Sequence, residues 1–358
     1  MLWDIFCRVI DNHGDLGVCW RLSADLALRG HKVRLWVDDA SALAWMAPDL
    51  ERNTEGFGQF NTPSGQVVVR SWNEALTPLD LSADVWVEAF GCELPEHFLA
   101  RAAQTYVDEQ SPAHPVWLNL EYLSAESYVE RSHKLPSPVM SGALKGRTKW
   151  FFYPGFTHKT GGLIREARVL DKLDQFTRQP QTQKSTLFCY EPEALKEAMQ
   201  LVAFQTPLHL WQVAHGRGAL AFKQALRVWP SHVDPPSHQF IPPVSQTKFD
   251  HLLNSSDLNF VRGEDSLVRA LWAGKAFVWQ IYPQHDGAHG PKLNAFLDWL
   301  HAPASLRHFH LRWNGLSQDP LPEVDLPAWQ ACTLAARERL LQQKDLVSQL
   351  LQFVEEKR

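Results

Sequence analysis

Residues 2–37 read LWDIFCRVIDNHGDLGVCWRLSADLALRGHKVRLWV, and this stretch decides the fold class. The apolar residues 2–10 predict a buried strand, and the polar segment DNHGD at 11–15 predicts a loop. Apolar residues at helical spacing predict a helix over about 16–29, and residues 32–37 predict a second strand. A strand, a helix and a strand in this order predict a parallel pair joined by a right-handed crossover.

Strand and helix signals keep alternating along the rest of the chain. In the first half, strands are predicted at 66–71, 84–90, 115–120 and 149–153. In the second half, strands are predicted at 185–190, 208–214, 238–241, 258–262 and 276–281. The helices of the second half are predicted at about 192–204, 217–227, 247–254, 265–273, 290–301 and 327–356. Two successive alternating sets indicate an α/β protein with two doubly wound domains.

Residues 155–183 separate the two sets. This segment contains Gly, Thr and Gln and runs into the polar stretch RQPQTQKS, which is typical of a passage between domains. We therefore expect two Rossmann-like domains, 1–180 and 181–341, which face each other across a cleft. A C-terminal helix at about 342–358 is expected to pack back on the first domain. Ligands of such sheets bind at the carboxyl ends of the strands, which is where chemistry is expected.

The composition is that of a globular enzyme. Of the 358 residues, 45% are hydrophobic and 21% are charged. The net charge of −5 argues against a broad surface for nucleic acid or for anionic membranes, although a local basic site is compatible with it. The five cysteines are widely spaced and include no CxxC pair, which is typical of reduced thiols in a cytosolic protein.

The N-terminus lacks the basic start and the unbroken apolar stretch of a signal peptide. No segment reaches the roughly 18 consecutive apolar residues that a membrane span requires. We therefore expect a soluble, cytoplasmic protein that has neither nucleic acid nor a membrane as its partner.

The first candidate site follows the first predicted strand. Asp11 and Asp15 lie between this strand and the helix, so both carboxylates can face the edge where ligands bind. Gly14 allows a tight turn and the close approach of a ligand, and the start of the helix supplies unpaired N–H groups. The alternative interpretation is structural: Asp15 caps the helix and Asp11 ends the strand. The pattern alone does not decide between the two.

The second candidate site is Arg262-Gly263-Glu264-Asp265-Ser266, where a strand ends and a helix begins. Helix N-termini bind anions through unpaired amides and the positive end of the helix dipole. Ser266 and the backbone amides could therefore hold a diphosphate, with Arg262 as a charged clamp. The two carboxylates suit sugar or ribose hydroxyls better than phosphate. The alternative is a capped helix with a salt bridge.

Other strand ends carry weaker signals. Gln280 and Tyr282 could contact a diphosphate or a sugar, or they belong to an ordinary strand-to-helix loop. Phe240 and Phe249 are candidates for stacking on a nucleobase, although a single Phe more often belongs to the core. Segments 90–93 and 117–122 either line an acceptor cleft or simply end buried strands, and we favour the second interpretation.

Motifs of several other enzyme classes are absent from the sequence. No GxGxxG fingerprint follows the first strand, which argues against NAD or FAD. There is no GxSxG elbow and no GxxxxGK[ST] loop, so a hydrolase triad and a P-loop are weak interpretations. The histidines form no HExxH motif, and no metal site is predicted. The residues alone indicate a two-domain α/β protein that binds an anionic, nucleotide-linked ligand.

Four stretches together carry a more specific resemblance. These are WDIFCRVIDNHGDLGVCWRL (3–22), WLNLEYL (117–123), FFYPGF (151–156) and NFVRGEDSLVRALWAGKAFVWQIYPQ (259–284). In this order they closely resemble the protein-arginine rhamnosyltransferases that modify elongation factor P, over nearly the whole chain. The resemblance implies a GT-B fold with an N-terminal acceptor domain and a C-terminal donor domain. It also implies that dTDP-β-L-rhamnose is a co-substrate, that no cofactor or metal is needed, and that an α-linked rhamnosyl-arginine forms with inversion and activates elongation factor P.

The resemblance also implies roles for single residues. The paired catalytic aspartates of the family match Asp11 and Asp15, and its essential acid in the donor domain matches Glu264. Its thymine-pocket aromatics match Phe240 and Phe249. With the neighbours named above, the expected donor-binding residues are Asn12, Gly14, Gly17, Tyr190, Phe240, Gln246, Phe249, Arg262, Gly263, Asp265, Ser266, Gln280 and Tyr282.

Two alternatives stay open at this point. One is another GT-B enzyme, such as a UDP-sugar transferase or an epimerase. Donor competition separates it from the rhamnosyltransferase, because dTDP should protect the rhamnosyltransferase against thermal unfolding better than UDP does. The other is a non-catalytic module that binds a nucleotide sugar but transfers nothing.

Overall fold

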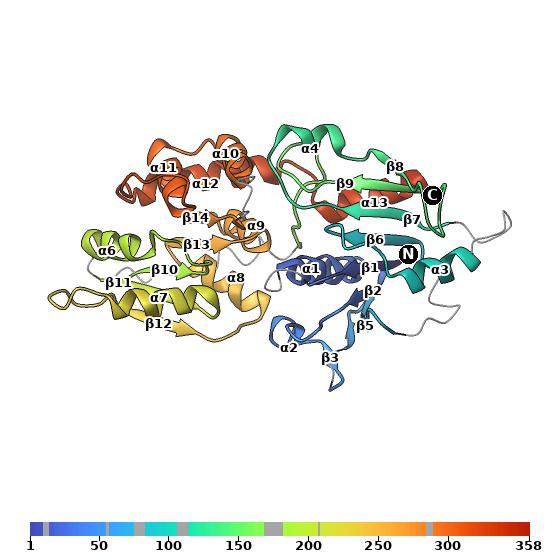
Figure 1. Cartoon of the computed structure of the whole chain (residues 1–358), viewed down its shortest axis with the longest axis horizontal. Helices are drawn as coiled ribbons and strands as arrows, with labels where there is room; N and C mark the ends of the chain where they lie inside the picture. Colours follow the sequence, from blue (N-terminus) through green and yellow to red (C-terminus); the bar gives the residue numbers. More distant parts are fainter. Residues whose placement is uncertain are drawn as a thin grey trace. The chain divides into compact units, whose positions relative to one another are not determined.

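The computed structural model describes residues 1–9, 14–54, 57–74, 83–105, 114–167, 182–206, 208–283 and 289–358. The chain divides into two units (Figure 1). Unit 1 comprises Met1–Glu166 with Gln343–Arg358, and unit 2 comprises Ala167–Gln342. The domain boundary expected at 180–181 lies outside the described residues.

Unit 1 is built on one sheet, which has nine strands within the described residues, in the order β3-β4-β5-β2-β1-β6-β7-β9-β8. The strands are β1 (Leu2–Cys7), β2 (Lys32–Val37), β3 (Glu51–Arg52), β4 (Gly58–Asn61), β5 (Gln66–Ser71), β6 (Val85–Ala89), β7 (Val116–Leu120), β8 (Pro136–Pro138) and β9 (Thr148–Phe152). Strands β5, β2, β1, β6, β7 and β9 pair in parallel and follow the 3-2-1-4-5-6 order of a doubly wound sheet. The order reverses between β1 and β6, which is therefore the topological switch point of this sheet.

Both faces of the sheet are covered. The helices of unit 1 are α1 (Gly14–Leu28), α2 (Leu43–Met46), α3 (Glu96–Thr105), α4 (Ser127–Ser132) and α13 (Leu346–Lys357). Side chains alternate across the sheet as the pleat requires: Ile5 and Leu35 pack in the larger core with α1 and α13, whereas Phe6 and Trp36 pack in a second core with Phe98 of α3. The strands are apolar on both sides, as expected for a parallel sheet with two covered faces.

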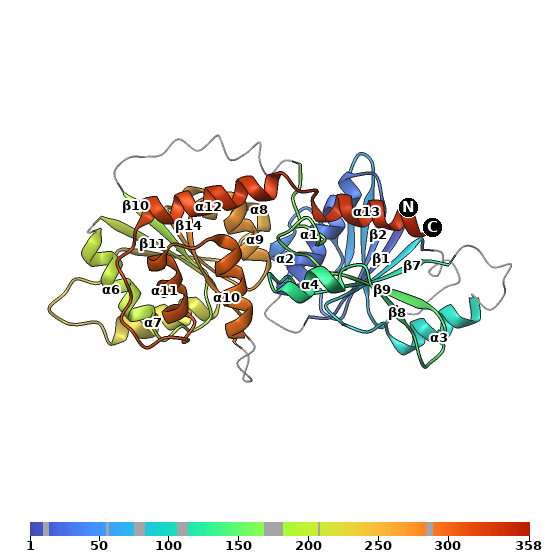
Figure 2. The same ribbon diagram turned by 90° about the horizontal axis from the view of Figure 1, so that it is seen from above.

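The C-terminal end of the chain differs from the single long helix predicted at 327–356. The structure has two helices, α12 (Leu326–Leu341) and α13, separated at Gln342–Asp345. A new helix begins here because the Asp345 side chain accepts a hydrogen bond from the amide of Ser348 at 2.9 Å, which is an N-cap. Helix α13 packs beside α1 (Figure 2).

A charged network ties α1 to α13. One guanidinium, that of Arg29, donates to Asp25 at 2.8 Å, to Asp345 at 2.8 Å and to Ser348 at 2.8 Å. Asp25 is only 3% exposed. Its burial raises the pKa of this carboxyl from 3.8 to about 6, although the bonded Arg29 acts to lower it. The ionised carboxylate is therefore costly at neutral pH.

We expect Asp25→Asn to remove a pH dependence from the stability of unit 1. Because the folded-state pKa of Asp25 lies above the unfolded value, its contribution is fully present below about pH 3.8 and is lost as the pH rises through about 6. The shift corresponds to at most about 3 kcal/mol. The difference in unfolding free energy between the wild type and Asp25→Asn, measured by urea titration from pH 4 to pH 7, should change in favour of the variant as the pH rises. A difference that stays constant would contradict the assignment.

Unit 2 is a smaller doubly wound sheet. Within the described residues it has five strands in the order β12-β11-β10-β13-β14, all paired in parallel. The strands are β10 (Gln183–Leu187), β11 (His209–Ala214), β12 (His238–Ile241), β13 (Leu258–Arg262) and β14 (Ala276–Gln280). The helices are α6 (Leu195–Gln205), α7 (Arg217–Arg227), α8 (Gln246–Ser255), α9 (Asp265–Ala273), α10 (His289–Leu300), α11 (Ala304–Trp313) and α12. The strand order reverses between β10 and β13, the switch point of unit 2.

The prediction of an α/β protein with two doubly wound sheets is confirmed. The antiparallel strands β3, β4 and β8 and the helices α2, α3, α4 and α11 are additional elements that the sequence patterns did not indicate. The predicted passage at 155–183 is described only up to residue 167 and from residue 182.

Candidate functional site

Asp15 lies at the switch point of unit 1. Strand β1 ends at Cys7 and α1 begins at Gly14, beside the reversal of strand order, and Asp15 is in the first turn of the helix. It is 9% exposed. The pKa of the free Cys7 thiol is raised well above its ordinary value, first by a hydrogen bond with the Cys19 thiol and by burial. The nearby charge of Asp15 raises it further.

The rest of this turn is partly described. Asp11 and Asn12, which the sequence assigns to the same site, lie outside the described residues. Gly14 has no described heavy atom within 4 Å of the position that a Cβ would take, and its φ is not in the left-handed region. Neither packing within the described chain nor backbone conformation therefore requires a glycine at this position. Gly17 is buried within α1.

Aromatic and polar side chains follow the carboxyl ends of β6 and β7. The ring of Phe90 stacks on that of Tyr122 with centroids 4.7 Å apart, and Asn119 donates a hydrogen bond to Glu121 at 2.7 Å. Phe90 has a φ of 59°, which ends β6. Residues 117–120 are buried in β7, so the interpretation of this part as a buried strand is confirmed. Tyr122 is 39% exposed and lies just beyond the strand.

Arg262 ends β13 at the switch point of unit 2. Its guanidinium carbon lies 4.5 Å from the ring centroid of Phe188 and 4.6 Å from that of Tyr190. One Nη atom donates to the carbonyl oxygen of Cys189 at 3.3 Å, and the residue is 9% exposed. Two aromatic rings and a carbonyl thus orient a buried cation at the end of the sheet.

Tyr190 connects several of the residues predicted to bind the donor. Its amide donates to Oε1 of Gln280 at 2.8 Å, and its ring meets that of Tyr282 edge-on at 5.6 Å. Gly263 has a φ of 62°, and a Cβ there would lie 3.6 Å from the Tyr190 hydroxyl. With Arg262, these residues form one cluster at the carboxyl ends of β10, β13 and β14.

The turn from β13 into α9 is fixed by Ser266. Its hydroxyl accepts a hydrogen bond from the amide of Arg262 at 3.0 Å and donates to the carbonyl of the same residue. Glu264 occupies the N-cap position without a side-chain cap, and its carboxylate instead pairs with Lys292 at 3.1 Å. The structural alternative was a capped helix with a salt bridge. The salt bridge is present, whereas the Glu264 side chain does not cap the helix. An anion at this helix would meet first-turn amides, which lack intrahelical partners.

The two candidate phenylalanines have different surroundings. Phe249, in α8, meets Phe188 edge-on at 5.2 Å, which joins it to the Arg262 cluster. Phe240, in β12, is 38% exposed and lies under the ammonium group of Lys223 at 4.7 Å. Gln246 begins α8, one helical turn before Asp250. Two hydrogen bonds of 3.1 and 2.8 Å join Asp250 to Arg269 and thus hold α8 against α9.

Three residues of this region were not found from the sequence. Phe188 follows β10 directly, so an aromatic residue at a strand end was the available signal. Trp279 donates from Nε1 to the carbonyl of Gly263 at 2.8 Å, and Lys292 reaches Glu264 from α10. Both contacts depend on tertiary packing, for which the sequence offers no local signal.

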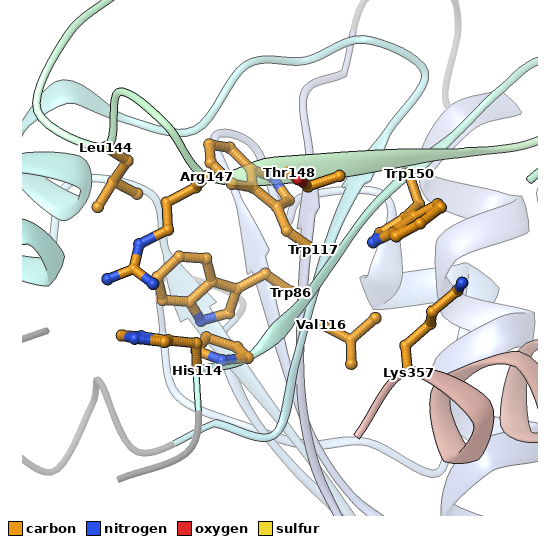
Figure 3. Close-up of a pocket in the computed structure, with 10 residues that line it drawn as sticks. Trp86, His114, Val116, Trp117, Leu144, Arg147, Thr148, Trp150 and Lys357 are labelled. Carbon is orange, nitrogen blue, oxygen red and sulfur yellow. The ribbon is translucent and has the colours of Figure 1, made fainter. Parts of the chain in front are cut away.

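A separate cavity of about 210 Å³ lies at the opposite end of the sheet of unit 1 (Figure 3). Trp86, Trp117 and Trp150 line it near the amino ends of β6, β7 and β9, together with Arg147 and Lys357. Trp117 is the one described lining residue that belongs to a segment considered for the acceptor cleft, and none of the described residues expected to be catalytic or to bind the donor lines the cavity. We therefore place the candidate site at the carboxyl ends and leave this cavity outside it.

Two further properties concern the described residues only. They contain no group of three or more His, Cys, Asp or Glu side chains arranged to hold a metal ion. Among the helices in these ranges, none has the length and the apolar character that crossing a membrane requires.

Comparison with known proteins gives consistent matches along the chain. Residues 3–355 match the family model described as elongation factor P (EF-P) rhamnosyltransferase EarP. A protein-arginine rhamnosyltransferase of Pseudomonas putida is 42% identical over 319 residues, which are 82% of this chain and 80% of the relative. A protein of the same name from Pseudomonas aeruginosa is 37% identical, over 98% of both chains.

Solved structures agree with these matches. A structure that describes EarP-mediated arginine glycosylation of translation elongation factor EF-P aligns with a TM-score of 0.61 and 27% identity, over 100% of this chain and 99% of the other. The spinosyn rhamnosyltransferase SpnG aligns with a TM-score of 0.51 at 10% identity, over 99% of this chain and 100% of the other, and this likeness concerns the fold alone. These neighbours confirm the GT-B glycosyltransferase fold class. The chain belongs to the EarP family of elongation factor P rhamnosyltransferases.

Proposed function

We propose that this chain is an inverting glycosyltransferase that moves L-rhamnose from dTDP-β-L-rhamnose to an arginine side chain of elongation factor P and thereby activates the factor. The proposal rests on family membership together with the location of two clusters. Unit 1 would bind the acceptor and unit 2 the donor. The reaction would use no metal and no cofactor, with dTDP-β-L-rhamnose as a co-substrate.

One observation carries the proposal. Asp15 follows the strand at the switch point of the first sheet, and Arg262 with Glu264 follows the strand at the switch point of the second sheet. Ligands of doubly wound sheets bind at this point, outside the carboxyl ends of the strands. A carboxylate in one sheet and a cation with a helix start in the other match the needs of a guanidinium acceptor and a diphosphate donor.

The acceptor chemistry requires more than a strong base. A guanidinium has a pKa above about 12, so no aspartate can remove its proton in the ground state. In our proposal Asp15, with Asp11, orients the guanidinium by charge-assisted hydrogen bonds and takes the proton as the new N–C bond forms. The nitrogen attacks the anomeric carbon on the face opposite to dTDP, which leaves with the bonding electron pair.

The donor chemistry requires stabilisation of the leaving diphosphate. In our proposal the first-turn amides of α9, with Arg262 and Tyr282, bind the charge that develops on it. Arg262 suits this role because Phe188 and Tyr190 orient its guanidinium. Glu264 belongs to the donor unit and would bind hydroxyls of the sugar rather than act as the base.

Phe249 is the better supported of the two candidates for stacking on thymine, because it packs against Phe188 beside Arg262. We expect Phe249→Ala to weaken dTDP binding by about 1 to 3 kcal/mol, the usual range for an aromatic ring that stacks on a base. Isothermal titration with dTDP measures this. Phe240→Ala is the matched control, and a larger loss in Phe240→Ala than in Phe249→Ala would reverse the assignment.

Transfer between purified components tests the proposed function. Elongation factor P is incubated with the chain and either dTDP-β-L-rhamnose or UDP-glucose, and intact mass is followed in time. The proposal requires the mass increase of one deoxyhexose with the dTDP sugar only. An increase with the UDP sugar instead would favour another GT-B transferase. Binding of dTDP-rhamnose without any increase would favour a non-catalytic module.

A further inference from the structure

The carboxylate of Glu264 is held by a lysine from a different helix. Nζ of Lys292, in the first turn of α10, lies 3.1 Å from Oε1 of Glu264. The side chains are 22% and 19% exposed, respectively, so this ion pair is largely shielded from solvent. Exposed ion pairs contribute little to stability because solvent screens them. Solvent screens the pair of Lys292 and Glu264 less, because both side chains are mostly covered.

Packing fixes the distance between the two helices. The indole of Trp279 donates to the carbonyl of Gly263, next to Glu264, at 2.8 Å, and its ring packs edge-on against Phe296 of α10 at 5.0 Å. Phe296 is four residues after Lys292, so both side chains lie on the same face of α10. The face of α10 that packs on Trp279 therefore also carries the lysine to the start of α9.

We propose that Lys292 is a positioning residue for the donor sugar, acting through Glu264. This inference rests on the proposed function, in which Glu264 accepts hydrogen bonds from sugar hydroxyls. A carboxylate on a flexible side chain can turn toward water. The ammonium group holds one carboxylate oxygen on the side of α10, which limits the directions in which Glu264 can accept hydrogen bonds from a ligand.

Binding of two ligands separates this role from a general structural one. We expect Lys292→Met to weaken binding of dTDP-β-L-rhamnose by about tenfold. This is the lower end of the loss in affinity that follows when a residue bonded to a metal-ligating side chain is removed. Binding of dTDP, which lacks the sugar, should stay unchanged. In turnover assays the KM for the dTDP sugar should rise, whereas the KM for the acceptor protein should not. Loss of folded protein would instead lower kcat alone.

Three further variants complete the experiment. Lys292→Arg restores a charge-assisted donor and should keep sugar-donor affinity within about threefold of the wild type. In a Glu264→Gln background, Lys292→Met should add little, because the effect passes through the carboxylate. Arg307→Met is the control: Arg307, in α11, pairs with Asp298 of α10, the helix that carries Lys292. Its loss should leave the affinity for dTDP-rhamnose unchanged.

The measurements distinguish a failure of the Lys292 role from a failure of the proposed function. Equal weakening of dTDP and dTDP-rhamnose in Lys292→Met would overturn the positioning role, as would wild-type affinity for both. Tenfold weakening that persists in the Glu264→Gln background would overturn the route through Glu264. A wild-type protein that binds dTDP-rhamnose and dTDP equally, and transfers nothing, would contradict the proposed function and the role of Lys292 together.

Discussion

Asp15→Asn should lower the rate of rhamnose transfer by about a hundred- to ten-thousandfold, the range for loss of a general base. The amide has nearly the same size as the carboxylate but can neither take a proton from the acceptor nor offset its charge. Because the donor is assigned to unit 2, the affinity for dTDP should stay within about twofold of the wild type. Single-turnover transfer and isothermal titration measure the two quantities.

Controls separate the chemical effect from a loss of folding. Asp15 is in the first turn of α1, where a negative charge contributes about 0.3 to 1 kcal/mol through the helix dipole. Asp15→Asn should therefore unfold at nearly the wild-type temperature. Asp49→Asn, at an exposed position of the same unit, is the matched control and should transfer at the wild-type rate. If Asp15→Asn kept more than about a tenth of the wild-type turnover, Asp15 would not be the base.

Asp4→Ala should destabilise unit 1 by about 3 to 5 kcal/mol, because it removes the carboxylate that pairs with the buried guanidinium of Arg34. The carboxylate of Asp4 is fully buried in β1 and accepts hydrogen bonds from Nε of Arg34 at 2.6 Å and from Nη2 of Arg34 at 2.7 Å. It also accepts one from Nε1 of Trp36 at 2.8 Å. Without the carboxylate, the guanidinium of Arg34 loses its two hydrogen bonds to Asp4 and the opposite charge inside the sheet. Urea unfolding followed by tryptophan fluorescence measures the loss.

A second variant distinguishes the lost partner from the lost volume. Asp4→Leu combined with Arg34→Met replaces the pair with apolar side chains, and such replacements of buried ion pairs are often neutral or stabilising. We expect the double variant to be clearly more stable than Asp4→Ala. A loss below about 1 kcal/mol in Asp4→Ala would show that the pair contributes little.

Much of the fold could be predicted because the strands are apolar on both faces and the helices follow them at regular spacing. In the βαβ unit of residues 2–37 the second strand has the predicted boundaries, whereas β1 ends at Cys7 rather than at residue 10 and α1 begins at Gly14 rather than at about residue 16. The exceptions have physical causes. The break before α13 depends on Asp345 as an N-cap, which the apolar periodicity on either side obscures. Strands β3, β4 and β8 are short antiparallel strands at the two margins of the sheet: β4 pairs with β5, β3 pairs with β4, and β8 pairs with β9.

The candidate site could be predicted as positions but not as contacts. The residues at the ends of β10, β13 and β14 were expected to come together, and Tyr190, Arg262 and Gln280 do so. Their assignment to the donor remains a prediction, as does that of Asp15 to the acceptor. The ring of Phe188 beside Arg262 and the ammonium group of Lys292 beside Glu264 arise from packing between elements far apart in the sequence.

In the proposed reaction, an arginine of elongation factor P receives the sugar. Residue-resolved mass spectrometry of elongation factor P, after incubation with this chain and dTDP-β-L-rhamnose, identifies the residue that carries the sugar. We expect one deoxyhexose on the side chain of a single arginine, and none when that arginine is replaced by lysine. A sugar on a serine, threonine or asparagine, or unmodified elongation factor P after complete incubation, would contradict the proposed reaction.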